Sequence, residues 1–310
     1  MTGVRRGLGA RLGIAALNLP WSGLGLLRVG TGRLAAAFLA APLVAMGMIA
    51  FYYIVGPRLT FLAYSAWMLI LLSVYFGAII VSAWLSWRRS GERRLPLLWW
   101  SRWYGIVAIW VALAFVLQAL IYFMNSRYKR FYSPAEAMVP TLLRNDRIVA
   151  SMRGAGAPRR GDIVLLRAPR SGAIYIERIA ALPGGRIALT GGVVILNGRP
   201  VPQRLVRTER VEFSGRLEDV RRLAERFPGE RREHEIYDAG ATPADDFPET
   251  LVQPGHVFVL GDNRDMSADS RFPPESWGLD QVPVANLVGR PLFFSWWPGS
   301  ENSGRPIAEP

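Results

Sequence analysis

The first 126 residues contain three long apolar runs that carry no charged side chain: 34–55, 61–87 and 104–124. A hydrocarbon core about 30 Å thick is crossed by about 20 helical residues, and a helix satisfies its own backbone groups in lipid. A cleavable secretory signal is the alternative for the first run, but no small-residue cleavage site follows it and two further runs do. The pattern therefore predicts a membrane domain, residues 1–126, with three transmembrane helices.

An earlier apolar segment, residues 12–27, has a different pattern. Pro20, Gly23 and Gly25 interrupt it, and Arg28 closes it. Proline and glycine both weaken a continuous helix. We therefore expect this segment to lie in the membrane interface instead of forming a fourth span.

After a polar tether expected at Asn125 to Arg130, the apolar residues occur in short segments separated by glycine, proline and aspartate. This pattern is typical of strands joined by turns. The best strand candidates are 148–152, 162–167, 173–180, 185–189, 193–197 and 255–260. Many short strands favour a folded sheet or barrel, so residues 127–299 are predicted to form a mostly-β domain.

Two parts of the carboxyl-terminal half differ in composition from these strand-like segments. Residues 203–251 are rich in charge and are expected to be an inserted cap region, with a helix near Leu217 to Phe227 and a loop from Ala239 to Glu249. Residues 300–310 have few apolar side chains. We expect them to form a disordered tail.

The arginines in the first half of the chain are distributed unevenly. Only Arg58 lies between the first and second runs, whereas ten others flank the opposite ends: Arg5, Arg6, Arg11, Arg28, Arg33, Arg88, Arg89, Arg93, Arg94 and Arg102. By the positive-inside bias, the amino terminus lies in the cytoplasm and the β domain lies on the outer face. The formal charge of +13 then indicates contact with anionic lipid of the bilayer, and no nucleic-acid-binding motif accompanies it.

Two residue counts restrict the chemistry. The chain has no cysteine, which excludes disulfides, thiol catalysis and thiolate metal sites. His234 and His256 are its two histidines, too few for an ordinary zinc site. We therefore expect no metal and no cofactor.

Three motifs point to one family: SPAEAMVPTL at 133–142, GDIV through YIERIAALPG at 161–184, and GDNRDMSADSR at 261–271. Together they resemble bacterial type I signal peptidases, over about Phe131 to Trp297. The resemblance implies a signal-peptidase-like folded sheet held at the outer, periplasmic face of the bacterial inner membrane. It also implies serine endopeptidase chemistry on the signal peptides of exported proteins, with a serine nucleophile and a lysine base.

Both residues of that dyad are replaced. Serine is a weak nucleophile that needs an adjacent base, and a lysine serves only when burial keeps it neutral. By the resemblance, Ala137 occupies the nucleophile position, Glu177 occupies the lysine position, and Ala135 replaces a serine that assists in binding the oxyanion. Lys129, the one lysine of the chain, precedes the first motif. No catalytic residue of the dyad is therefore intact.

The residues around the dyad match the family. By the resemblance, Ser267 corresponds to the serine that hydrogen-bonds the lysine, Asp269 and Arg271 form an ion pair below it, and Asp162 and Arg178 also occupy family positions. The pocket of the peptide groove corresponds to Met138, Leu142, Tyr175 and Ile176. The same residues also fit a purely structural role, in the fold and its core.

These residues leave three hypotheses. The first is a non-hydrolytic homologue that binds signal-peptide segments or regulates secretion, with an active peptidase paralogue as a further partner. The second is an active signal peptidase that uses unorthodox residues such as Ser267 and Glu177. The third is a structural membrane scaffold with no affinity for signal peptides.

Overall fold

The computed structural model describes residues 6–55, 61–91, 98–154, 156–213, 215–295, 302 and 305–307. Four of the arginines used to predict the orientation (Arg5, Arg58, Arg93 and Arg94), most of the 300–310 tail and Trp297 lie outside the described residues. The chain divides into two compact units, residues 1–125 and 126–310.

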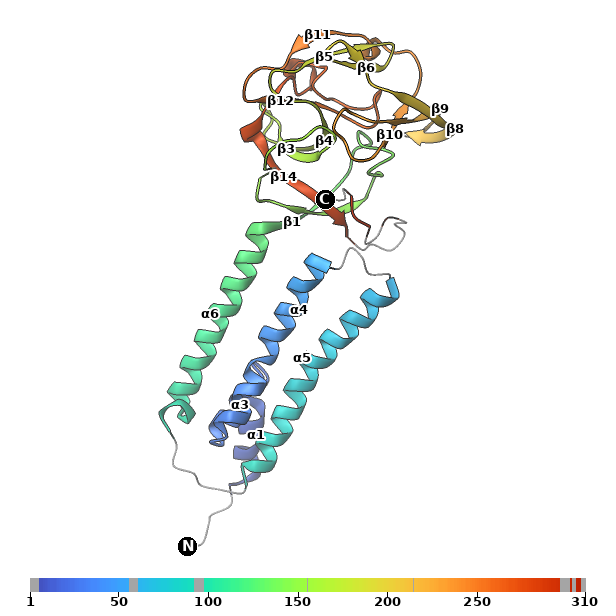
Figure 1. Cartoon of the computed structure of the whole chain (residues 1–310). Coiled ribbons are helices and arrows are strands. Elements are labelled where there is room, and N and C mark those ends of the chain that lie inside the picture. Colours follow the sequence, from blue (N-terminus) through green and yellow to red (C-terminus); the bar gives the residue numbers. More distant parts are fainter. Residues whose placement is uncertain are drawn as a thin grey trace. The chain divides into compact units, whose positions relative to one another are not determined.

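The first unit is helical (Figure 1). Its helices are α1 (Leu8–Ala16), α2 (Leu24–Arg28), α3 (Gly32–Leu39), α4 (Ala41–Val55), α5 (Phe61–Arg89) and α6 (Trp103–Arg127). Among its described residues, three stretches are long and apolar enough to cross a membrane: 32–49, 66–89 and 103–127. The prediction of three apolar amino-terminal helices is confirmed, although α3 and α4 are separated at Ala40 because Pro42 cannot donate a backbone hydrogen bond.

The segment expected at the membrane interface forms two short helices, α1 and α2, joined by a turn. Asn18 is fully buried in that turn, and its side-chain oxygen accepts hydrogen bonds from the backbone N–H groups of Gly23 and Gly25. Its amide nitrogen bonds Ser86 on α5 at 3.1 Å. The turn is thereby fixed to the second long helix, while its depth in a membrane stays a prediction.

The second unit consists mainly of strands, as predicted. They are β1 (Tyr128–Tyr132), β2 (Arg147–Ser151), β3 (Ile163–Arg167), β4 (Ile174–Ala181), β5 (Arg186–Thr190), β6 (Val193–Leu196), β7 (Arg199–Pro200), β8 (Gln203–Phe213), β9 (Arg216–Glu225), β10 (His234–Asp238), β11 (Phe247–Leu251), β12 (His256–Leu260), β13 (Val282–Pro283) and β14 (Leu287–Phe294). All six strand candidates are confirmed to within one residue at each end.

The strands form three sheets. The largest has the order β1-β2-β14-β3-β4-β12-β13, and a second has the order β11-β5-β6-β7. The third, β10-β9-β8, is here called the insert (residues 203–238) and projects at one side of the unit (Figure 1). Buried apolar residues of β4 and β12 in the first sheet and of β5 and β6 in the second form one core cluster, which joins these two sheets.

Two local predictions were wrong. The helix expected near Leu217 to Phe227 is strand β9, because antiparallel pairing with β8 and β10 on both sides overrides its helical spacing. The expected tether at Asn125 to Arg130 is the end of α6 followed by β1, which pairs with β2. Residues 305–307 bond the backbone of β14 through Phe294 and Leu292, and the disorder expected for residues 300–310 as a whole stays a prediction.

Candidate functional site

Strand β4 carries Glu177, the residue that the sequence predicts at the position of the family lysine. Glu177 is 1% exposed, and both of its carboxylate oxygens lie 3.3 Å from the hydroxyl oxygen of Ser267. Strand β3 fixes its register through the Val164–Glu177 pair. The second and third motifs, about 90 residues apart, therefore meet at this contact.

The first motif reaches the same place through its backbone. The carbonyl oxygen of Ala137 accepts a hydrogen bond from Asn263 N at 2.9 Å. A Cβ atom on Gly261 would lie 2.6 Å from that oxygen and 2.3 Å from the Cβ of Ser267. Only glycine permits so close an approach. The absence of a side chain at Gly261 therefore lets Ala137 and Ser267 lie beside each other.

The surroundings of Glu177 favour the neutral carboxyl group. Burial raises its pKa well above the ordinary value, and the negative charges of Asp269 and Asp262 raise it further. The hydrogen bond from Ser267 and the positive charge of Arg271 oppose this rise without cancelling it. A carboxyl that holds its proton is a poor acceptor for the proton of a hydroxyl.

The single lysine of the chain is in a different part of the sheet. Lys129 is exposed on β1, where it pairs with Ala150 of β2. In the order of the sheet, β2, β14 and β3 lie between β1 and β4. Lys129 is therefore not the proton acceptor for a group beside Glu177.

A buried ion pair supports the site from one side. Both Nε and an outer nitrogen of Arg178 donate to the carboxylate of Asp262, at 2.7 and 2.6 Å, and the hydroxyl of Thr141 also bonds that carboxylate. Burial acts to raise the pKa of Asp262, but the charge and hydrogen bonds of Arg178 outweigh it and lower the pKa. The pair joins β4 to the first and third motifs.

A second buried pair shapes the loop that carries Ser267. Arg271 donates to Asp269 from Nε at 2.9 Å and from an outer nitrogen at 2.8 Å. Asp269 in turn accepts a hydrogen bond from Gly261 N at 3.1 Å. The two ends of the third motif are thereby tied together below the Glu177–Ser267 contact.

The other residues that the sequence singled out divide between different places. Met138, Leu142 and Ile176 pack in one apolar cluster, in which Met138 and Leu142 are buried. Tyr175 packs on a different cluster with Val164 and Leu166. Asp162 bonds Arg290 and the backbone of Arg159, away from the reacting groups.

One edge of β4 is open beside the site. Strand β12 pairs with β4 only from Arg178 onward, through Leu260, whereas β3 pairs with β4 along 174–178. In the described part of the chain, no strand pairs with residues 174–177 on the β12 side. An extended peptide would fit there by β-augmentation.

The sequence did not reveal several charged residues next to the site. Asp262 and Arg264 lie inside the third motif, so the sequence located them, but it did not indicate which residues they pair with. Glu225 and Glu230, from the insert, had no motif signal at all, yet Glu225 pairs with Arg264 and Glu230 with Arg178. Within the described residues, no group of three potential ligands is arranged to hold a metal ion.

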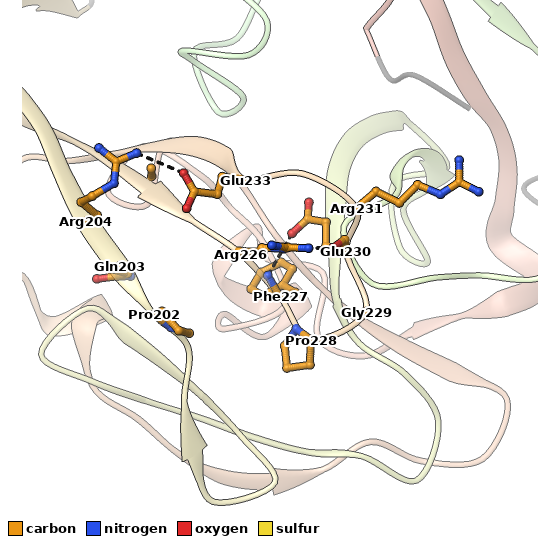
Figure 2. Close-up of a pocket in the computed structure, with 11 residues that line it drawn as sticks. Pro202, Gln203, Arg204, Arg226, Phe227, Pro228, Gly229, Glu230, Arg231 and Glu233 are labelled. Carbon is orange, nitrogen blue, oxygen red and sulfur yellow. Dashed lines mark hydrogen bonds and ion pairs between the residues drawn. The ribbon is translucent and has the colours of Figure 1, made fainter.

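A cavity of about 870 Å³ opens on the insert, away from Ala137. Figure 2 shows its lining, with Arg226, Phe227 and Glu230 in the middle, Arg204 at the left and Arg231 at the right. Arg204 pairs with Glu233 at 3.1 Å, and Nε of Arg226 donates to the backbone oxygen of Glu230. Glu230 thus connects this cavity with Arg178.

Comparisons with known proteins agree with the motifs. The family described as "Signal peptidase, peptidase S26" matches residues 100–297. A signal peptidase I of Leptolyngbya laminosa is 29% identical over 202 residues, which are 62% of this chain and 78% of the relative. A signal peptidase I of Pseudomonas aeruginosa is 30% identical over 201 residues, which are 57% of this chain and 68% of the relative. A solved signal peptidase I of Enterococcus faecalis has 23% identity and a TM-score of 0.26, and covers 43% of this chain and 95% of its own.

Proposed function

Because this chain belongs to the signal peptidase family, peptidase S26, we propose that it is a membrane-anchored homologue that binds signal-peptide segments without hydrolysing them. In this role it regulates secretion, by holding signal peptides or by acting with an active peptidase paralogue. One observation carries the proposal. The carboxyl of Glu177 lies 3.3 Å from Ser267, and by the family resemblance Glu177 stands at the position of the base and Ala137, with only a methyl group, at that of the nucleophile.

The chemistry of the exchange supports this reading. A lysine base acts only when buried and neutral, and the surroundings of Glu177 also favour a neutral side chain. The exchange therefore adds no net charge to the buried site, so the neighbouring ion pairs Arg178–Asp262 and Arg271–Asp269 stay balanced. What is lost is a nitrogen lone pair that accepts a proton and a hydroxyl that attacks a carbonyl.

The family supports the proposed ligand and its binding strand, and the arginine pattern supports the proposed location in the membrane. Signal peptidase I relatives imply a signal-peptide segment as the ligand, and the open edge of β4 at 174–177 offers backbone groups to it. The arginine bias supports a cytoplasmic amino terminus and a periplasmic β domain on the inner membrane. Lipid of that bilayer surrounds the three apolar helices.

The decisive experiment repairs the dyad. We compare the purified full-length chain with Ala137→Ser, Glu177→Lys and the double variant on a signal-peptide substrate, and measure products by mass spectrometry. We expect cleavage from the double variant alone, because nucleophile and base are both required. Wild-type cleavage that disappears in Ala137→Ser or Ser267→Ala preparations would contradict the proposal, whereas contaminating peptidase would act equally in all preparations.

Binding separates the proposal from a scaffold role. A fluorescent signal peptide should bind the wild-type chain saturably. Ile176→Trp should weaken that binding, because the larger ring fills the space beside Met138. Leu217→Trp is the matched control, since Leu217 is 67% exposed on the insert. No saturable binding to the wild-type chain would favour the scaffold.

A second candidate is an active peptidase that uses Ser267 and Glu177. The 3.3 Å contact favours it, as do relatives named signal peptidase I. It predicts wild-type cleavage that is lost in both Ser267→Ala and Glu177→Gln. The raised pKa of Glu177 further predicts that any such activity increases as the pH rises and the carboxyl ionises.

A further inference from the structure

The insert contains a buried histidine whose two ring nitrogens each face a carboxylate. His234, the first residue of β10, is 7% exposed. Its Nδ1 lies 3.0 Å from both oxygens of Glu230, and its Nε2 lies 3.2 Å from an oxygen of Glu225. A neutral imidazole has one N–H donor, whereas an imidazolium has two. These distances suit a doubly protonated ring, with a hydrogen bond at Nδ1 and an ion-pair contact at Nε2.

Each of these carboxylates also reaches the candidate site. Glu225 on β9 is fully buried and accepts hydrogen bonds from Arg264, which belongs to the loop that carries Ser267. Glu230 lies 3.7 Å from Arg178 on β4. The histidine thus stands between the insert and both halves of the site.

The backbone makes the same connection. Tyr237 of β10 donates its N–H to the carbonyl of Asp262 at 2.8 Å, and its carbonyl accepts from Arg264 N at 3.0 Å. Asn263, which lies between Asp262 and Arg264 in the loop, donates its backbone N–H to the carbonyl of Ala137. A movement of β10 would therefore reach the loop and the first motif together.

The charges of this cluster balance only when the histidine is protonated. Three basic side chains then face three acidic ones: Arg178, Arg264 and His234 against Glu225, Glu230 and Asp262. Loss of the proton leaves one negative charge in excess among buried groups. An uncompensated buried charge is strongly unfavourable.

The electrostatics and the access of water are consistent with this balance. Burial and the charge of Arg178 lower the pKa of His234, but the bonds to Glu225 and Glu230 and the charge of Asp262 raise it above its ordinary value overall. Figure 2 shows Glu230, the partner of Nδ1, in the lining of the open cavity. Protons can exchange with solvent by that route.

We propose that His234 is a proton-operated latch that holds the insert against the candidate site. With the proton bound, Glu225 and Glu230 are bridged and the site loop is held. When the proton leaves to solvent, the carboxylates lose their common partner, the turn at 226–233 loosens and the loop at 261–267 becomes more mobile. The latch does not depend on whether the site binds or cleaves peptides.

Hydrogen–deuterium exchange of the full-length chain in detergent tests the latch. Exchange is followed by peptide mass spectrometry from about pH 6 to about pH 9, with exchange times scaled for the intrinsic rate. We expect protection of residues 226–234 and 261–267 to fall with a single-proton midpoint above about 6.5, the ordinary pKa of histidine.

Two variants and a matched control make the test specific. His234→Gln carries no charge at any pH, so protection of both segments should be low and independent of pH. Glu230→Gln removes one acidic partner and should move the midpoint to lower pH. His256→Gln is the control, because His256 lies on β12 outside the insert and its ring bonds the carbonyl of Pro254, and it should behave like the wild type.

Several results would overturn the latch. They are constant wild-type protection over the whole range, an equal effect of His256→Gln and His234→Gln, or a midpoint that rises in Glu230→Gln. If tryptophan fluorescence shows that His234→Gln is unfolded, the midpoint of Glu230→Gln still decides the question.

Discussion

Four buried carboxyl groups surround the candidate site at nearly the same depth, but they differ in their partners. Glu177, Asp262, Glu225 and Asp269 are each at most 1% exposed. The last three pair with the arginines Arg178, Arg264 and Arg271 respectively, whereas Glu177 contacts the hydroxyl of Ser267.

The ionisation of these groups follows their partners. Burial acts to raise the pKa of Glu225, yet Arg264 and His234 lower it to about 2. Burial together with negative neighbours raises the pKa of Glu177. The paired carboxylates therefore form a charged frame, whereas position 177 requires a side chain that can be neutral. A neutral side chain at position 177 is thus compatible with the charged frame around it.

The largest effect is expected from breaking the frame. Arg178→Ala leaves Asp262 without its bidentate partner and removes the charge that faces Glu230. Removal of one partner from a buried pair costs about 3–5 kcal/mol. Denaturant unfolding of the full-length chain in detergent, followed by tryptophan fluorescence, measures this loss. A loss below about 1 kcal/mol would show that the frame does not depend on this pair.

A smaller effect, with a defined pH dependence, is expected at Glu177. Its pKa is higher in the folded chain than the ordinary value of 4.5, so the folded state binds more protons and the free energy of unfolding falls as the pH rises above about 4.5. The slope is at most about 1.4 kcal/mol per pH unit.

Glu177→Gln should remove that slope. The variant should exceed the wild type in stability by about 1–2 kcal/mol near pH 6, in the same unfolding measurement. Glu275→Gln, at a side chain 75% exposed, is the control and should keep the wild-type slope. A variant with the wild-type slope, or with lower stability near pH 6, would mean that Glu177 is ionised in the fold.

The smallest effect is expected from a surface pair. Glu249 and Arg186 lie 3.1 Å apart, but their side chains are 50% and 56% exposed. Water screens such pairs, so Glu249→Gln should change the free energy of unfolding by less than about 1 kcal/mol, and by less still in high salt. A loss comparable to that of Arg178→Ala would erase the distinction between the frame and the surface.

Much of the architecture could be predicted because its signals are local. The uncharged runs predict long apolar helices, and short apolar segments separated by glycine, proline and aspartate predict β3, β4 and β12. The three motifs placed Ala137, Glu177 and Ser267 in one site, which the contacts among them support. The prediction failed at β9, where the spacing fits a helix but strands on both sides decide the structure.

The sequence by itself determined which side chains stand at positions 137 and 177: the methyl group of Ala137 and the carboxyl group of Glu177. Only the tertiary structure decided what those atoms can do. The protonation of Glu177 depends on burial and on Asp269 and Asp262, which lie far away along the chain. The pairing of His234 with two acids depends on the folding of the insert. Charges interact through space, so the order of residues alone does not fix them.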